Sequence, residues 1–247
     1  HELGHNYYQR AYNGKSTLFL DSANDGFHEA LGDTVALSVT PAYLKSLGLI
    51  DKEPPAEADI ALLLQTALDK VAFLPFGLTI DKWRWEVFSG RIPPEKYNQA
   101  WWELKRKYQG VAPPSPRGEK FCDAATKTHI NDDAAQYYDY ALSYALLFQL
   151  HDHIAGTILK QNPRATNYYG SVAAGGFLRS IMTPGSSRDW RAAADDASRL
   201  ETAGSGSFAS RIAHHWCELA MEADDRGDGA EAEAALDRAR EVAPASP

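Results

Sequence analysis

Apolar residues recur at intervals of three and four along most of the chain, which is the pattern of amphipathic helices. This pattern predicts helices over residues 1–12, 26–39, 41–48, 92–110 and 134–160. A further long apolar stretch covers residues 59–90, with an interruption expected at Pro75 and an end at Gly90. Only residues 126–130 (TKTHI) resemble an extended segment, and strands and helices do not alternate. We therefore expect a mainly α architecture.

The first five residues, HELGH, contain two histidines one helical turn apart. Residues i and i+4 lie roughly 40° apart around a helix, so His1 and His5 can both reach one metal ion. Glu2 lies on the shoulder of the same face, where its carboxylate could polarise a water on that ion. Such a short match also arises by chance on exposed helices, so a third ligand is required. A chain that begins on a ligand is expected to be a fragment whose upstream part is missing.

Glu29 follows His5 after 23 intervening residues, and Asp33 comes one helical turn later, so one helix face presents both carboxylates. The alternative is a solvated acidic face. However, the flanking residues are apolar, and an unpaired charge on a mostly buried helix is costly. We therefore predict that His1, His5 and Glu29 bind Zn²⁺ and that Asp33 accepts the spare ring N–H of a ligand histidine.

HELGH followed by GFHEALGD resembles the angiotensin-converting enzyme family, the peptidyl-dipeptidase A group of zinc metallopeptidases. The likeness continues through ALDKVAFLPFGLTIDKWRWEVFSG, KTHI and QYYDYALSYALLFQLHDHIAG, and it covers about residues 1–190. It implies a gluzincin-type fold with a deep cleft between two helical halves, of which this chain is a fragment. It also implies a periplasmic or secreted protein whose targeting region lies upstream. Thimet-type oligopeptidases and thermostable carboxypeptidases share H-E-x-x-H and a later Glu, with different residues around that Glu, and are the alternatives.

The composition agrees with a catalytic domain and argues against a nucleic-acid partner. Hydrophobic residues make up 44% of the 247 residues, which is enough for a sizeable core. The net charge of −8 and the pI near 5.5 do not suit a phosphate-binding surface, which needs clustered Lys and Arg. No run of eighteen apolar residues occurs, so we expect no membrane span in this segment. Cys122 and Cys217 are interpreted as separate thiols, with pairing left open.

Lys127 and His129 are two residues apart, so in an extended segment their side chains point the same way and can meet one peptide. Without the flanking match they would be interpreted as an ordinary surface pair. By resemblance, Lys127 matches the lysine that binds the terminal carboxylate of the substrate. His129 matches the histidine that holds the peptide carbonyl near the scissile bond.

Aromatic residues recur at helical spacing in QYYDYALSYALLFQLHDH, and such a stripe more often packs in a core than lines a site. By resemblance, Tyr137 shares the terminal carboxylate with Lys127. The Tyr140 hydroxyl matches the donor to the developing oxyanion, a contact worth about 3 kcal/mol in the transition state. Asp69, Lys70 and Phe73 match residues that line the primed side of the family's cleft, although packing of an amphipathic helix explains them nearly as well.

Two positions depart from the pattern of the animal members, which bind an activating chloride. Asp139 stands in place of the arginine beside the oxyanion tyrosine, and a carboxylate cannot coordinate an anion. Lys105 replaces the arginine of the other chloride site and lacks its planar fork. These replacements argue against chloride activation.

Beyond about Trp190 the family pattern is no longer recognisable. Residues 191–247 are predicted to form a divergent helical tail whose role stays open, with two helical stretches around RGDG. His214, His215 and Cys217 in this tail are weak evidence for a second metal site, because such a site needs four well-spaced ligands.

The motifs together predict a zinc metallopeptidase that releases dipeptides from the C-terminus of oligopeptides, in the context of its full-length parent. Glu2 is expected to act as the general base towards the bound water and then as the proton donor to the leaving amine. The competing prediction is a non-catalytic or incomplete peptide-binding fragment, because the upstream half of the family's cleft is not part of this chain.

Overall fold

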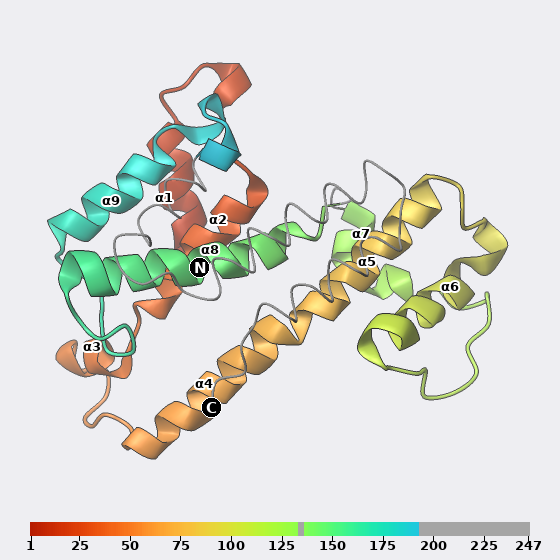
Figure 1. Ribbon diagram of the computed structural model, residues 1–247, viewed down its shortest axis with the longest axis horizontal. Helices are drawn as coiled ribbons and strands as arrows, with labels where there is room; N and C mark the ends of the chain where they lie inside the picture. The colour runs from red at the N-terminus through yellow and green to blue at the C-terminus, as the bar shows by residue number, and fades with distance from the viewer. Residues whose placement is uncertain (133–135, 193–247) are drawn as a thin grey trace, which may run out of the picture. The chain divides into compact units, whose positions relative to one another are not determined.

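The computed structural model describes residues 1–132 and 136–192, and these residues are arranged as helices joined by turns and loops (Figure 1). No strand occurs in either described range, and the prediction of a mainly α architecture is confirmed. The chain divides into two compact units. Among the described residues, 1–47 and 145–192 form the first unit, and 48–132 and 136–144 form the second.

The first unit packs helix α1 (Glu2–Tyr12) against α2 (Asp25–Leu37), with α9 (Val172–Met182) also in contact with α1. The later part of α8 (Asp139–Asp152) and the π-helical segment His153–Leu159 belong to the same unit. Burying a large apolar side chain contributes about 1.5–3 kcal/mol. The buried apolar residues of this unit include Tyr8, Tyr12, Phe27, Ala30, Leu31, Leu147, Leu150, Ile154 and Ala174.

Polar side chains fix the first residue of three helices in this unit. Asn24 accepts a hydrogen bond from the Gly26 N–H at the start of α2, and Ser171 caps α9 in the same way. Thr40 caps the short helix α3 (Pro41–Ser46). A cap of this kind typically contributes about 1 kcal/mol, because it satisfies a backbone donor that has no partner within the helix.

The second unit contains helices α4 to α7 and the start of α8. Its aromatic core brings the Trp83 and Trp101 rings to 6.1 Å edge to face, and Trp83 Nε1 donates to the Tyr97 carbonyl at 2.9 Å. The helices span Ala56–Val71 (α4), Phe73–Phe88 (α5), Tyr97–Leu104 (α6) and Thr128–Asp132 (α7). The buried residues of the core are Ile80, Trp83, Trp101, Ala124 and Tyr137.

The break in the long apolar stretch lies at Ala72, not at Pro75 as the sequence predicts. Helix α4 ends at Val71 and α5 begins at Phe73, and α5 continues the direction of α4 (Figure 1). Pro75 therefore lies in the first turn of α5. A proline is tolerated there because its missing N–H would have no partner within the helix.

The expectation of an extended segment over residues 126–130 is wrong for most of its length. Lys127 has extended backbone angles (φ −88°, ψ 112°), but Thr128 begins α7. Local side-chain hydrogen bonds favour the turn: Thr126 Oγ1 donates to a carbonyl three residues earlier, and Asn131 Nδ2 donates to the Ala125 carbonyl at 2.9 Å. Such hydrogen bonds from Thr and Asn side chains to the backbone favour turns over strands. The β-branched residues in this segment suggested a strand because composition does not show these bonds.

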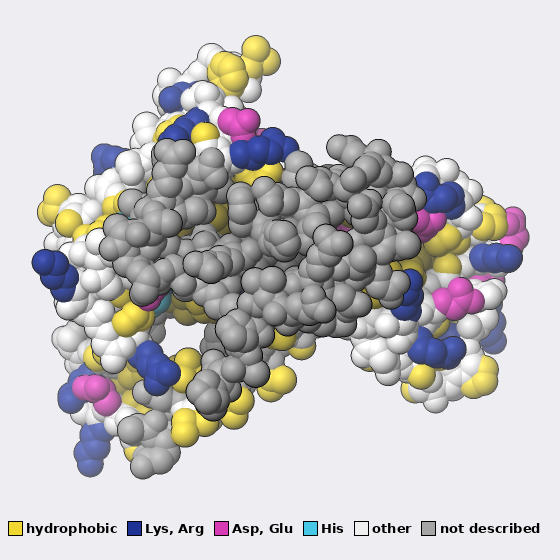
Figure 2. All heavy atoms as spheres, in the orientation of Figure 1, with side chains coloured by type: hydrophobic (Ala, Val, Ile, Leu, Met, Phe, Trp, Pro, Cys, Tyr) yellow, Lys and Arg dark blue, Asp and Glu magenta, His cyan; other side chains and the backbone are white. Residues whose placement is uncertain are grey.

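Helix α4 presents an exposed apolar surface, which Figure 2 shows as hydrophobic side chains over this helix. The stretch Ile60–Phe88 is long and apolar enough to cross a membrane, judged by length and composition alone. This finding differs from the expectation of no span. A single helix that meets these two criteria does not by itself assign a membrane role. The exposed residues are Ile60, Leu62, Leu63, Leu64, Leu68 and Val71.

A buried ion pair on α5 holds the segments that carry the predicted substrate-binding residues. Asp81 and Arg84 are 1% and 0% exposed, and Arg84 Nη2 donates to Asp81 Oδ1 at 3.2 Å. The Asp81 carboxylate also accepts the backbone N–H groups of Tyr137 and Tyr138, at 2.8 and 2.6 Å. Arg84 Nη1 donates to the carbonyl of His129 at 2.8 Å. Burial raises the pKa of Asp81, while the Tyr137 N–H and Arg84 oppose that rise.

We predict that Asp81→Asn lowers the free energy of unfolding by about 3 kcal/mol, because it removes one charge of a buried, hydrogen-bonded ion pair. Denaturant unfolding of the protein measures this change. Glu86→Gln is the matched control, since the Glu86–Arg91 pair is exposed and its loss should cost less than about 1 kcal/mol. Equal effects of the two substitutions would contradict a structural role for the buried pair.

Candidate metal centre and substrate-binding residues

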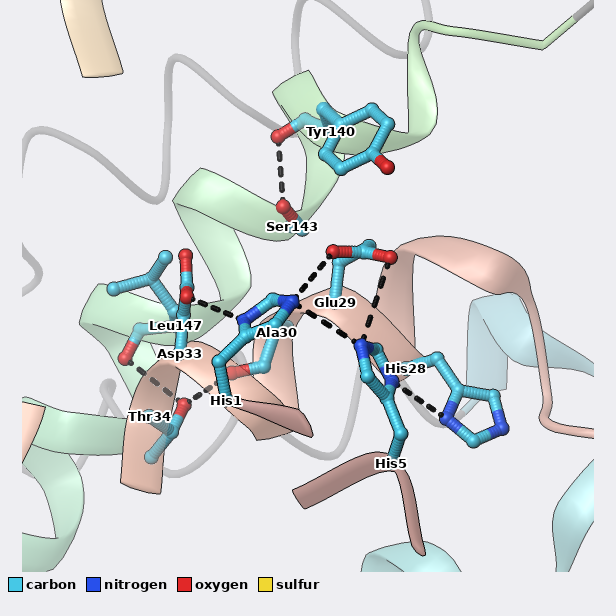
Figure 3. A network of polar contacts seen from close by, with 10 residues as sticks. All are labelled: His1, His5, His28, Glu29, Ala30, Asp33, Thr34, Tyr140, Ser143 and Leu147. Carbon is cyan, nitrogen blue, oxygen red and sulfur yellow. Dashed lines mark hydrogen bonds and ion pairs between the residues drawn. The ribbon is translucent and has the colours of Figure 1, made fainter. Parts of the chain in front are cut away.

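Three potential metal ligands converge where α1 meets α2 (Figure 3). The Nε2 atoms of His1 and His5 lie 3.2 Å apart. Glu29 on α2 faces them, with one carboxylate oxygen 3.4 Å from His1 Nε2 and the other 3.8 Å from His5 Nε2. One ligand atom from each residue lies within 4.8 Å of the other two. Within residues 1–132 and 136–192, this is the one group of three His, Cys, Asp or Glu side chains so arranged.

The chemistry of this cluster fits a catalytic metal site. Two imidazole nitrogens and one carboxylate are the ligand set of zinc hydrolases that keep a fourth position open for water. Asp33 Oδ1 lies 2.7 Å from His1 Nδ1, so this carboxylate can hold the His1 ring with Nε2 unprotonated and directed at the ion. The ligands are partly exposed, which leaves access for water and substrate.

Two glycines allow the close approach of α1 and α2 that forms this cluster. A Cβ atom added at Gly4 would lie 2.6 Å from the Gly32 Cα, and one added at Gly32 would lie 2.9 Å from the His1 carbonyl oxygen. Both contacts are to backbone atoms, which cannot move aside as a flexible side chain can. The spacing of the two helices, and therefore of His5 and Glu29, depends on these glycines.

Glu2 lies in the first turn of α1 and is exposed. A carboxylate at a helix N-terminus is favoured by the helix dipole. It follows His1 directly in the chain, on the element that supplies two of the three ligands. Its role as the general base stays a prediction.

His28 is a polar contact of the cluster that the sequence reasoning did not assign. Its Nδ1 lies 3.2 Å from His5 Nδ1, and its Nε2 lies 3.1 Å from the Tyr12 hydroxyl. Burial, together with the neighbouring His5, lowers the pKa of His28 to about 4, and burial raises the pKa of Tyr8 beside it to about 12. The signal was present in the sequence, since His28 is a polar residue directly before Glu29 on a mostly apolar helix.

In the second unit, the structure brings together the residues predicted to bind peptide. His129 Nε2 lies 3.2 Å from the Tyr140 hydroxyl, and the His129 and Tyr137 rings are 5.2 Å apart. The Lys127 ammonium lies 5.5 Å from the centre of the Tyr137 ring, so Lys127 and His129 both face Tyr137 although the segment is not a strand. Phe73 on α5 packs at 5.3 Å from the Tyr137 ring and at 5.7 Å from the Tyr140 ring.

Other predicted positions lie around this aromatic group. Asp69 is exposed in the last turn of α4. Lys70, which was predicted together with Asp69 and Phe73, places its ammonium 4.3 Å from the centre of the Tyr144 ring. Asp139 is 5% exposed at the start of α8. Lys105 lies over the rings of two aromatic residues, and burial lowers its pKa.

The remaining cysteine and tail predictions fall mostly outside the described residues. Cys122 is exposed and has a free thiol. Cys217, His214 and His215 lie beyond residue 192, as does nearly all of the predicted tail 191–247.

Most of this chain matches the model of one known protein family. The family model described as angiotensin-converting enzyme matches residues 1–207. The chain belongs to the angiotensin-converting enzyme family. The match confirms the resemblance noted in the sequence, in preference to the thimet-type and carboxypeptidase families. The family consists of peptidases.

Angiotensin-converting enzymes from three animals are each similar to this chain over 77% of its length. The protein of Bos taurus is 46% identical over 194 residues, and that of Theromyzon tessulatum is 41% identical over 193 residues. The protein of Haematobia irritans exigua is 38% identical over 199 residues. The matched part is 15%, 31% and 32% of these three relatives, so the chain spans less than a third of each.

We predict that Gly4→Ala lowers the free energy of unfolding by about 1–3 kcal/mol and weakens metal binding, because the new methyl group forces α1 away from α2. Thermal unfolding and a chelator-competition assay measure the two effects. Gly176→Ala on α9 is the matched control. Gly176 is exposed with no atom within 4 Å of its added Cβ, so alanine there should stabilise the helix by up to about 1 kcal/mol. A Gly4→Ala protein with unchanged stability would contradict close packing at this position.

Proposed function

We propose that the protein carrying this chain is a zinc-dependent peptidase that releases dipeptides from the C-terminus of oligopeptides. The observation that carries the proposal is the convergence of His1, His5 and Glu29 in a chain of a peptidase family. Within the proposal, these three residues hold Zn²⁺ and Asp33 orients His1. The bound ion supplies a Lewis acid for the peptide carbonyl and lowers the pKa of a water in its open position.

The proposal assigns the proton transfers to Glu2. As a general base, its carboxylate takes a proton from the attacking water, and as a general acid it returns that proton to the leaving amine. Its place on the first turn of α1, next to the ligand His1, supports this role. The Tyr140 hydroxyl is proposed to donate to the oxyanion, and His129 to hold the neighbouring peptide carbonyl. The 3.2 Å contact between their side chains supports a shared orientation.

Specificity for the peptide terminus is assigned to Lys127 and Tyr137. Lys127 supplies a positive charge for the terminal carboxylate, and the Tyr137 hydroxyl supplies a second donor. Their contact in the second unit supports joint binding of one group. Asp69 and Phe73 are proposed to border the primed side of the substrate. Oligopeptides are the proposed partners, and a periplasmic or secreted location is proposed from the family alone.

We predict that Glu2→Gln keeps about one zinc per chain but reduces kcat by at least about 10²-fold, because the general base is lost while the metal ligands remain. Metal content and turnover of a blocked tripeptide are measured on the same preparation. Glu29→Gln is the comparison, since it removes a ligand and should lose zinc. Zinc-free wild-type protein would overturn the metal assignment, and zinc-loaded wild-type protein without turnover would support a non-catalytic peptide-binding role.

We also predict that cleavage requires a free terminal carboxylate and does not require chloride. Amidation of the substrate removes a charge-assisted contact worth about 1.5–3 kcal/mol, so kcat/KM should fall by roughly 10- to 150-fold. Sodium chloride and sodium acetate should give equal rates, because Asp139 cannot bind an anion and only general ionic strength acts. Equal cleavage of acid and amide would indicate an endopeptidase. Activation specific to chloride would contradict the alignment of Asp139.

A further inference from the structure

The two ligand histidines differ in what holds their spare ring nitrogens. Both direct Nε2 at the same point, 3.2 Å from each other, so in both rings Nδ1 is the atom left for a second contact. For His1 that contact is the Asp33 carboxylate at 2.7 Å. For His5 it is His28 Nδ1 at 3.2 Å (Figure 3). The imidazole of His28 therefore occupies for His5 the position that a carboxylate occupies for His1.

The direction of the hydrogen bonds follows from metal binding. A histidine that binds a metal through Nε2 carries its proton on Nδ1, so His5 must donate and His28 Nδ1 must accept. His28 then carries its own proton on Nε2, and it can donate to the Tyr12 hydroxyl at 3.1 Å. One consistent set of protons thus runs from His5 through His28 to Tyr12.

The packing around His28 keeps its ring in this orientation. The Tyr8 ring lies 4.5 Å from the His28 ring at an angle of 44°, and the Tyr12 ring lies 6.0 Å away and nearly perpendicular to it. Both tyrosines are buried, and the Tyr8 hydroxyl is fixed by the Ala23 N–H at 3.1 Å. Turning the His28 ring by half a turn about its bond to Cβ would move Nδ1 away from His5.

We propose that His28 is a positioning residue that fixes the tautomer and the orientation of His5 for binding zinc. It acts through His5 rather than by touching the ion. The proposal rests on the zinc site of the proposed function. Loss of an outer hydrogen-bond partner of a ligand typically weakens metal affinity 10- to 100-fold, so the effect is measurable without assaying catalysis.

Three substitutions of His28 distinguish the effect of its Nδ1 acceptor from the effect of its packing between Tyr8 and Tyr12. His28→Phe keeps an aromatic ring between Tyr8 and Tyr12 but removes both nitrogens, and we expect the Kd for zinc to rise 10- to 100-fold. His28→Asn can place its carbonyl oxygen near the former Nδ1 position, and we expect a Kd within about three-fold of wild type. His28→Gln reaches instead towards Tyr12, and we expect it to behave like His28→Phe.

A buried histidine elsewhere in the same unit provides the control. His151 is 8% exposed, and its ring nitrogens contact the Tyr168 hydroxyl at 2.6 Å and the Pro163 carbonyl at 2.8 Å. His151→Phe should lower the melting temperature and leave the Kd for zinc unchanged. Asp33→Asn, which weakens the partner of the other ligand histidine, sets the scale expected for a true outer partner.

The measurements are chelator competition for zinc and the visible absorption of the cobalt-substituted protein. Cobalt absorption reports the ligand field, so it should shift in His28→Phe and return towards wild type in His28→Asn. A Kd for His28→Phe equal to that of wild type would overturn the proposal, and so would an Asn variant no better than Phe. If the wild-type protein binds no zinc, the proposed function fails first, and the role of His28 fails with it.

Discussion

The close backbone contact between α1 and α2 is the constraint on which the cluster of His1, His5 and Glu29 depends. At Gly4 and Gly32 the two helices approach so closely that neither position has room for a methyl group. This contact lets ligands from two helices converge, although each helix by itself supplies an incomplete set. The loop between α1 and α2 only has to be long enough for α2 to pack against α1. The Asn24 cap fixes where α2 begins, and 23 residues separate His5 from Glu29. Helix packing, rather than the loop, therefore sets the ligand geometry.

The second unit uses a buried charge for a comparable purpose. The residues around Lys127 and Tyr137 belong to short turns and a helix start, which have little regular structure to hold them. Asp81 accepts the N–H groups at the start of α8, and Arg84 binds the carbonyl of His129, so one ion pair on α5 fixes both segments. Such a pair adds little net stability compared with apolar packing, but breaking it leaves an uncompensated charge. Its value here is the orientation of the side chains that are proposed to bind peptide.

The sequence was sufficient for the parts of the structure that follow from local spacing. The helical periods predicted most helices within residues 1–160, but they did not predict α9 (Val172–Met182). The i, i+4 pair together with Glu29 and Asp33 predicted the cluster that the structure contains. Two predictions were wrong because they depend on more than local spacing. The helix break lies at Ala72 and not at Pro75. The segment from Thr126 turns into a helix because side chains hydrogen-bond to nearby carbonyls. His28 was missed because its partner lies 23 residues away and its role follows from ring orientation, which spacing does not encode.

The unequal partners of the two histidines have an electrostatic consequence once zinc is bound as proposed. The proposed site already gives the ion three carboxylates, those of Glu2, Glu29 and Asp33, whose total charge exceeds the two positive charges of Zn²⁺. An imidazole at position 28 adds no further negative charge to them. A carboxylate at position 28 would add one more negative charge to the site. It would hold the ion more firmly, but it would weaken the ion's pull on electrons of a bound water and so raise that water's pKa. A neutral acceptor orients His5 without this loss, which gives a physical reason for an imidazole at this position.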